Sequence, residues 1–454
     1  MVLLTYMKKC AARTTNQLNR TCVYLMNCRF RTHLLIAFII RLALIYYGYI
    51  QDKRSEVPYT DIDYKVVTDG ARYVLDGNSP FDRHTYRYSP ILAYLQMLNI
   101  WIHMACGKVI YAIFDITVSF LIYKIIRAEQ LRQSRKGIQT IKCQNKEMHL
   151  VNSCDCFKQN KPSTFLARAS AYFWLYNPLT LVISTRGNGD SISSVFVILT
   201  IYLLSRSQDL KRGRNWMIFA AGLCHGFSIH LRLYPIVFSL AYYLSLSEKL
   251  INSTGEFFRQ IILPSSKQLT LIFGTILGFS VVSVIFYHLY GWQYIYEAYL
   301  YHFVRKDVRH NFSLYFLMQY LGSNVHFSII EKLTIIIPQL CLILYLSISF
   351  GQFLKTLPFC IFSLSFIIVT FNSVVTSQYF VWYMAALPLC LKNFKKLSLL
   401  KAILYFSLWL LGQGMWLLPA YLLEFKTYNT FYWIGAQSAV FFLVNSFILI
   451  RLIE

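Results

Sequence analysis

Residues 268–288 read QLTLIFGTILGFSVVSVIFYH, an apolar run without any Asp, Glu, Lys or Arg. About 20 such residues are enough for an α-helix to cross the hydrocarbon layer of a membrane. The whole chain of 454 residues has the same character, because 56% of it is hydrophobic and only 14% is charged, against roughly 25% charged residues in soluble domains. This composition excludes soluble globular, disordered and fibrous proteins, and it predicts an all-α polytopic membrane protein.

Apolar runs predict about twelve membrane spans, several of them shorter than a perpendicular helix needs. The predicted spans are 34–50, 105–126, 165–184, 192–205, 215–230, 234–247, 268–288, 327–350, 356–371, 379–391, 399–417 and 431–450. Two further apolar segments, 80–104 and 312–323, are short. We expect them to form helices that lie at the membrane surface or re-enter the membrane.

The distribution of charge predicts the topology. The net charge of +24 could indicate a nucleic-acid partner. With the N-terminus in the cytoplasm, however, the cytoplasmic segments hold 27 basic and 7 acidic residues, and the opposite segments hold 12 and 11. This asymmetry is what the positive-inside rule requires. It places both termini in the cytoplasm and explains nearly all of the excess charge without nucleic acid.

This topology defines the domain organisation. A basic cytoplasmic arm, 1–33, precedes one transmembrane domain, 34–450, and a short cytoplasmic tail, 451–454, follows it. Within the domain we expect a first non-cytoplasmic loop at 51–104, a flexible cytoplasmic loop at 127–164 and an Arg/His-rich non-cytoplasmic loop at 291–323. None of the eleven cysteines lies in a predicted non-cytoplasmic loop, so we expect no disulfide framework.

The first non-cytoplasmic loop carries paired acids. Asp61 and Asp63 follow the first span and can both approach one substrate if the loop is extended or turning. A carboxylate there could remove a proton from a sugar hydroxyl, or the pair could hold a divalent ion on a diphosphate. A solvated acidic loop would explain the same two residues.

Basic residues recur on the same side of the membrane. Arg87 lies between two tyrosines, and the segment 301–313 supplies further candidates, which are His302, Arg305, Arg309 and His310. In a helix Arg305 and Arg309 would share a face, and two guanidinium groups on one face suit a lipid phosphate. The alternatives are snorkelling of Arg87 and an ordinary interfacial basic helix.

Smaller polar clusters also fall on this side. They are Arg186 with Asn188 and Asp190, His230 with Arg232, and Asn372 with Gln378. Ionisable residues at span ends that face a helix bundle are costly and are often functional. Each cluster alone is more often structural, but their presence in one compartment favours an active site there.

The order of these motifs is similar to that of the catalytic subunits of glycosylphosphatidylinositol (GPI) mannosyltransferase I, the PIG-M type. The matching segments are 51–52, 59–64, 77–80, 85–88, 175–178, 184–188, 301–302, 305, 307, 309–313, 370–372, 376–380 and 412–416. The resemblance covers roughly residues 30 to 450. The basic arm and the cysteine-bearing loop 127–164 diverge from it.

The resemblance implies a glycosyltransferase of the GT-C fold in the endoplasmic reticulum (ER) membrane, with a lumenal active site. The implied donor is dolichyl-phosphate mannose, and the implied acceptor is glucosaminyl-(acyl)phosphatidylinositol. The product would carry the first α1,4-linked mannose of the GPI core. The resemblance also implies a small membrane partner of the PIG-X or Pbn1 type. We expect no cofactor.

Roles follow from this resemblance, since Asp61 and Asp63 match the family's Asp-x-Asp motif. A β-linked donor that gives an α product requires in-line inversion with one base, which we expect to be Asp63, with Asp61 positioning the acceptor or sharing the role. The expected donor-phosphate ligands are Arg305, Arg309, His310, Arg87 and Arg186. The expected substrate-binding residues are His302, Asn188, Asp190, Asn372 and Gln378. No metal ligand is expected, because a monophosphate donor does not need the cation bridge that a diphosphate does.

Other functions remain open from the sequence alone. A lipid or saccharide transporter would explain many spans, but it predicts polar residues at mid-depth and on both sides of the membrane. A GT-C mannosyltransferase with another lipid-linked acceptor fits the same motifs. A structural membrane subunit does not require the Asp, Arg and His loops.

Overall fold

The computed structural model describes residues 28–147, 164–210, 212–305, 307, 311–322 and 329–454. Within these ranges every regular element is a helix and no strand occurs. This confirms the predicted all-α class. Residues 1–27 of the predicted basic arm lie outside the described residues.

Seven helical runs in the described chain are long and apolar enough to cross a membrane. They are α2 (Phe30–Arg54), the first part of α5 (Cys106–Glu147), α8 (Asp190–Ser207), the run of α12 (Ser266–Ile295), η3 (Tyr296–Leu300) and α13 (Tyr301–Val304), most of α15 (Ile329–Gly351), α18 (Leu399–Lys426) and α19 (Phe431–Ile453). The chain is therefore a multi-pass membrane protein by length and composition. The larger number of about twelve spans stays a prediction.

The other five predicted spans coincide with helices that are shorter, interrupted or less apolar than these seven. These are α6 (Phe165–Leu175) with α7 (Pro178–Thr185), α9 (Arg214–Leu231), η2 (Tyr234–Phe238) with α10 (Ser239–Leu244), α16 (Leu357–Thr370), and η4 (Ser377–Tyr379) with α17 (Phe380–Cys390). The expectation of one helix over 165–184 is wrong. The Asn177 side chain accepts a hydrogen bond from Leu179 N at 2.9 Å, and Pro178 begins a new helix, because proline is favoured at a first helical position but breaks a helix interior.

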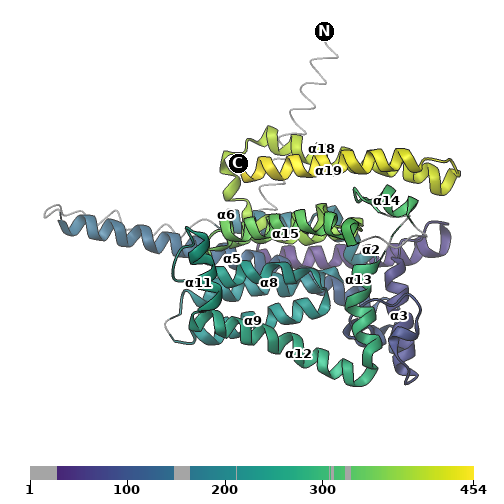
Figure 1. Cartoon of the computed structure of the whole chain (residues 1–454), viewed down its shortest axis with the longest axis horizontal. Helices are drawn as coiled ribbons and strands as arrows, with labels where there is room; N and C mark the ends of the chain where they lie inside the picture. Colours follow the sequence, from purple (N-terminus) through teal and green to yellow (C-terminus); the bar gives the residue numbers. More distant parts are fainter. Residues whose placement is uncertain (1–27, 148–163, 211, 306, 308–310, 323–328) are drawn as a thin grey trace, which may run out of the picture.

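Figure 1 shows the long helices α5, α8 and α9 side by side, with α18 and α19 along one flank. The short helices α3 (Ile62–Leu75), α13 and α14 (Phe316–Leu321) lie at one end of this bundle, and α11 (Thr254–Ile262) and the far end of α5 lie at the other. The segments that the charge pattern assigns to opposite sides of a membrane are thus at opposite ends of the molecule. Which end faces the cytoplasm stays a prediction.

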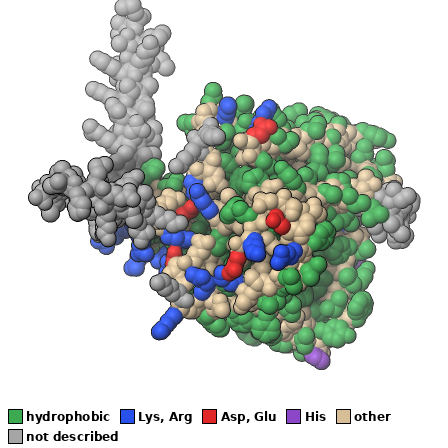
Figure 2. Space-filling view, turned by 60° about the vertical axis from the view of Figure 1, so that its left-hand side comes forward, with side chains coloured by type: hydrophobic (Ala, Val, Ile, Leu, Met, Phe, Trp, Pro, Cys, Tyr) green, Lys and Arg blue, Asp and Glu red, His purple; other side chains and the backbone are tan. Residues whose placement is uncertain are grey.

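The end that carries α11 is rich in basic side chains. Figure 2 turns this end forward and shows Lys and Arg gathered with a few acids, beside a broad surface of hydrophobic side chains. Such a surface suits contact with lipid chains, because hydrophobic side chains can face hydrocarbon without loss of hydrogen bonds to water.

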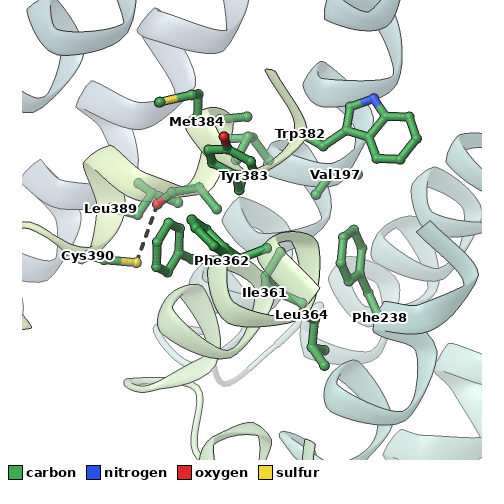
Figure 3. Close-up of a cluster of buried hydrophobic side chains, with 14 of the residues drawn as sticks. Val197, Phe238, Ile361, Phe362, Leu364, Trp382, Tyr383, Met384, Leu389 and Cys390 are labelled. Carbon is green, nitrogen blue, oxygen red and sulfur yellow. Dashed lines mark hydrogen bonds between the residues drawn. The ribbon is translucent and has the colours of Figure 1, made fainter. Parts of the chain in front are cut away.

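The core lies around α16 and α17. All but two residues of α16 and nearly all of α17 are buried, as expected for helices that are apolar on every side. Figure 3 shows Phe362 of α16 close to Tyr383 and Cys390 of α17, with Phe238 of η2 completing the cluster. This packing fixes the segment between the two helices, residues 371–379, which reaches the candidate site.

One predicted loop differs in the structure, and a predicted helical segment does not. α5 continues to Glu147, so the first part of the predicted flexible loop 127–164 is helical, because its polar residues still include good helix formers. Residues 148–163 lie outside the described chain. The predicted interfacial segment 80–104 contains the one-turn helix η1 (Pro80–Asp82) and α4 (Pro90–Trp101).

Candidate active site

The paired acids lie at the start of α3 and have different local roles. Asp61 is the residue before the helix, and its carboxylate accepts a hydrogen bond from the backbone N–H of Asp63 at 3.2 Å. Aspartate is among the best residues for this capping position. Asp63 lies in the first helical turn, and its carboxylate is therefore free of the capping role.

The start of α3 is held by contacts from two other helices. Asp52, near the end of α2, accepts hydrogen bonds from the backbone N–H and the hydroxyl of Thr60, the first of them at 2.9 Å. Lys108 of α5 donates to the same hydroxyl at 2.6 Å. Asp61 N donates to the carbonyl of Arg186 at 2.9 Å. These bonds hold the start of α3 in place, and with it the carboxylates of Asp61 and Asp63.

Two amide side chains connect Asp63 to the bundle. Gln378 Nε2 donates to Asp63 Oδ2 at 3.3 Å, and Asn188 Nδ2 donates to Gln378 Oε1 at 2.7 Å. Asn188 Oδ1 in turn accepts from the backbone N–H of Asp190 at 3.0 Å. Residues from three distant parts of the sequence therefore form one chain of hydrogen bonds that ends at the Asp63 carboxylate.

The surroundings of Asp61 disfavour the ionised form of its carboxyl group. Burial raises the pKa of Asp61, and the neighbouring charge of Asp63 raises it further. Hydrogen bonds from Asp63 N and Asn188 and the positive charge of Arg186 act in the opposite direction without overcoming these causes. Arg186 Nε has no hydrogen-bond partner among the described residues, so this arginine retains a free donor beside the two acids.

A cavity of about 530 Å³ lies next to this group of residues. One wall is polar, with the side chains of Arg87, Tyr88, Arg232, His302, Arg305, Asn372 and Tyr379. The other is apolar and comes largely from α15, with Ile335, Ile336, Leu340 and Ile343. Such a cavity offers a site for a charged group at one end and hydrocarbon at the other.

Three arginines of the polar wall each form an ion pair with a carboxylate. The pairs are Arg87 with Glu297 at 2.6 Å, Arg232 with Asp190 at 2.8 Å, and Arg305 with Asp307 at 3.0 Å. Arg87 also lies over the ring of Tyr301, and Arg232 over that of Tyr88. A guanidinium group has five N–H donors, so each arginine can bind an anion while its carboxylate fixes its direction.

Tyr88 joins the cavity to the acids. It lines the cavity, and burial raises its pKa well above the usual value, with the negative charge of Asp63 as the next largest cause. Asp63 therefore lies within electrostatic reach of the cavity wall. Asp63 itself does not line the cavity, so Tyr88 links this carboxylate to the cavity wall.

His230 fixes the back of the polar wall. This side chain is 1% exposed, and its ring nitrogens share hydrogen bonds with Ser89 at 2.9 Å and with Tyr299 at 3.0 Å. The contact ties α9 to the segment before α4 and to η3. The backbone that carries Arg87 and Arg232 is thereby held in place.

The structure brings most of the predicted site residues together. Asp61, Asp63, Arg186, Asn188, Asp190 and Gln378 form one connected group, and Arg87, His302, Arg305 and Asn372 lie on the cavity wall. Arg309 and His310 lie outside the described residues. Arg305 lies after the end of α13 at Val304 and has extended backbone, so a helix face shared with Arg309 stays a prediction.

Sequence reasoning missed Arg232 as a site residue. It noted the residue only within a small polar cluster at a span end. The signal was an arginine directly after an apolar run on the same side as the acids, but its partner Asp190 is 42 positions away and its cavity position depends on the fold. Tyr88 and Tyr379 were missed for the same reason.

Comparison with known proteins agrees with this architecture. The family described as mannosyltransferase (PIG-M) matches residues 183–453, which is more than half of the chain. Three relatives match nearly the whole length. The zebrafish (Danio rerio) "GPI alpha-1,4-mannosyltransferase I, catalytic subunit" is 35% identical, over 92% of this chain and 95% of its own length. The Dictyostelium discoideum "GPI mannosyltransferase 1" is 33% identical, over 92% of this chain and 90% of its own length. The Saccharomyces cerevisiae protein of the same name is 31% identical, over 91% of this chain and 92% of its own length.

These matches lie well above the level at which relatives share only a fold, and they cover the segments that form the site. The chain therefore belongs to the PIG-M family of mannosyltransferases.

Proposed function

We propose that this enzyme transfers the first α1,4-linked mannose of GPI-anchor biosynthesis from dolichyl-phosphate mannose to glucosaminyl-(acyl)phosphatidylinositol. The relatives' names support the transfer and its linkage. The observation that carries the proposal is the cavity, where three arginines face an apolar wall beside two aspartates. A phosphate attached to a long hydrocarbon chain and a sugar has this distribution of charge.

The reaction is an inverting displacement with Asp63 as the base. Asp63 takes the proton of the glucosamine 4-hydroxyl as that oxygen bonds to the anomeric carbon of mannose. The bond from the anomeric carbon to the donor oxygen breaks at the same time, and its electron pair leaves with dolichyl phosphate. One oxygen of Asp63 already accepts from Gln378, and a carboxylate has further lone pairs that can take the proton.

The donor phosphate lies among Arg87, Arg232 and Arg305, with Arg309 and His310 as further ligands from the adjoining segment. Preorganised N–H donors stabilise charge as it develops on the leaving group. The dolichyl chain lies along the apolar wall formed by α15. Arg186 is a further candidate ligand of the donor phosphate, and Asp61 positions the acceptor or shares the role of base. A monophosphate leaving group needs no cation bridge, so full activity is expected after exhaustive chelation.

The larger architecture follows from the same proposal. The enzyme has the GT-C fold in the ER membrane, with about twelve crossings, both termini in the cytoplasm and the cavity open to the lumen. The short apolar helices at 234–244 and 357–370 support crossings beyond the seven long helices. A small membrane subunit of the PIG-X or Pbn1 type binds the chain, and the term "catalytic subunit" in the zebrafish relative's name supports such a partner.

A microsomal assay with radiolabelled dolichyl-phosphate mannose and glucosaminyl-phosphatidylinositol tests the proposal. Wild-type enzyme should form the mannosylated lipid, and Asp63→Asn should lower turnover by about 100-fold or more, the usual scale for loss of a general base. Expression should be unchanged, because the asparagine side chain has nearly the same shape. Near-normal turnover of Asp63→Asn would remove the base assignment, and transfer only to another lipid acceptor would replace the substrate.

A further inference from the structure

The hydrogen bonds around Asn188 and Gln378 have a definite direction. At one end is the backbone N–H of Asp190, which can only donate, so the atom of Asn188 that faces it at 3.0 Å is the carbonyl oxygen. The Asn188 amide group then points the other way. It donates to Gln378 Oε1 at 2.7 Å, which turns the Gln378 amide group toward Asp63.

The other end of the chain requires the same orientation. An ionised carboxylate can only accept hydrogen bonds, so the atom of Gln378 that faces Asp63 Oδ2 at 3.3 Å is the nitrogen. Both ends therefore select one orientation of both amides. If Asp63 were protonated and donated along this bond, the Gln378 amide would have to turn over, and Asn188 would face it with a second donor.

We propose that Asn188 and Gln378 form an amide relay that positions Asp63 and turns an N–H donor toward its carboxylate. This inference rests on the proposed role of Asp63 as the base. It assigns the two residues to the enzyme's own machinery, as positioning residues, in place of the substrate contacts that the sequence suggested. Asn188 is 1% exposed, which fits a residue that acts through a neighbour.

The relay works within a charged neighbourhood. The titratable groups that face Asp63 are Asp61 on α3, Tyr88 before α4, Tyr111 on α5, Asp190 on α8, Arg232 after α9 and Tyr379 on η4. Asp61 and Asp190 are negative and oppose a third negative charge, whereas Arg232 favours it. Donation from Gln378 adds to the favourable side without adding a net charge.

The decisive measurement is the pH dependence of turnover at saturating substrates. Gln378→Met keeps the length of the side chain and removes the donor, so the acidic limb of the profile should move to higher pH by roughly one unit. Gln378→Glu places a second carboxylate against Asp63 and should move the limb further. The position of the limb does not depend on the amount of folded enzyme, so poor expression does not obscure the result.

A double-mutant cycle tests whether Asn188 acts through Gln378. Asn188→Ala alone leaves the Gln378 amide free to turn over. The acidic limb of the pH profile should then move to higher pH, but by less than in Gln378→Met. In the Gln378→Met background the same change should have no further effect on the limb. A full additional shift would mean that Asn188 acts directly, through Asp61 or the substrate, and would overturn the relay.

Two controls separate this inference from the proposed function. Gln352→Met removes an amide that bonds to Ile251 near α11, at the far end of the bundle from α3, and should leave the profile unchanged. If Asp63→Asn abolishes turnover while Gln378→Met leaves the limb in place and raises only KM, the relay is wrong and the base assignment stands. If Asp63→Asn remains active, the base assignment itself fails.

Discussion

Two neighbouring aspartates of the same motif have separate physical tasks. Asp61 caps α3, and Asp63 receives the hydrogen bond from Gln378. The sequence predicted both residues as candidates because they stand together after the first span. It could not divide their roles, since the division depends on where α3 begins and on Gln378, which is 315 positions away.

This division predicts the behaviour of Asp61→Asn. Because burial and the charge of Asp63 raise the pKa of Asp61, the folded protein binds this proton more tightly than the unfolded chain does. The stability from that proton is present at low pH and is lost as the pH rises through the folded pKa. Asparagine keeps the cap and avoids the buried charge, so we expect the variant to melt at the same or a higher temperature than wild type at neutral pH, with the advantage lost in acid.

Asp61→Ala provides the comparison, because it removes the charge and the cap together and should cost about 1 kcal/mol of stability. Melting of the detergent-solubilised protein and turnover of both variants are the measurements. Turnover of Asp61→Asn should fall far less than that of Asp63→Asn. An equal fall would make the two acids equivalent in the chemistry.

At the scale of elements, the loop from Arg186 to Asp190 decides whether the site forms. It supplies the carbonyl that holds Asp61, the Asn188 amide and the partner of Arg232. The loop turns at Gly187, where the backbone φ is +96°. Residues other than glycine rarely adopt this backbone conformation. The sequence showed the polar residues of this loop, but the close approach of α3 to Gly187 is a tertiary fact.

We therefore expect Gly187→Ala to be strongly destabilising. A Cβ there would lie 2.5 Å from the ring of Tyr64 on α3, in addition to the backbone strain. Gly77 is the matched control, since its φ of +78° is similar and its added Cβ would meet nothing within 4 Å. Gly77→Ala should show only the strain, about 1–2 kcal/mol. Thermal melting of the two variants should differ clearly, and equal melting points would mean that α3 and the loop are not packed as described.

At the scale of the whole molecule, the membrane class and the positions of the long apolar helices were predictable from the sequence. Apolar runs mark these helices but not α3, α11 or the second half of α5, and alternating charge divides the connecting segments between two ends, as Figure 1 shows for α3 and α11. The interruptions were harder to predict, because Asn177 and Pro178 lie inside a continuous apolar stretch. The pairing of Arg232 with Asp190 and of Asn188 with Gln378 required the packed bundle.

The predicted topology is open to a direct test in intact microsomes. Single cysteines placed at exposed positions beside α3, such as Ser55, should be protected from a membrane-impermeant thiol reagent until the membrane is opened. Cysteines at Ser253, beside α11, should react at once, because that end is predicted to face the cytoplasm. The measurement is labelling with and without permeabilisation. The reverse pattern would place the two aspartates in contact with the cytosol and end the lumenal mechanism.

The ion pairs of Arg87, Arg232 and Arg305 affect which anions the site binds when no substrate is present. Three guanidinium groups without acids of their own would attract chloride or free phosphate, and an incoming lipid would first have to displace it. Here each arginine brings its own neutralising acid. The three arginines should therefore bind small anions weakly at ordinary ionic strength, and such anions should compete poorly with the proposed lipid donor.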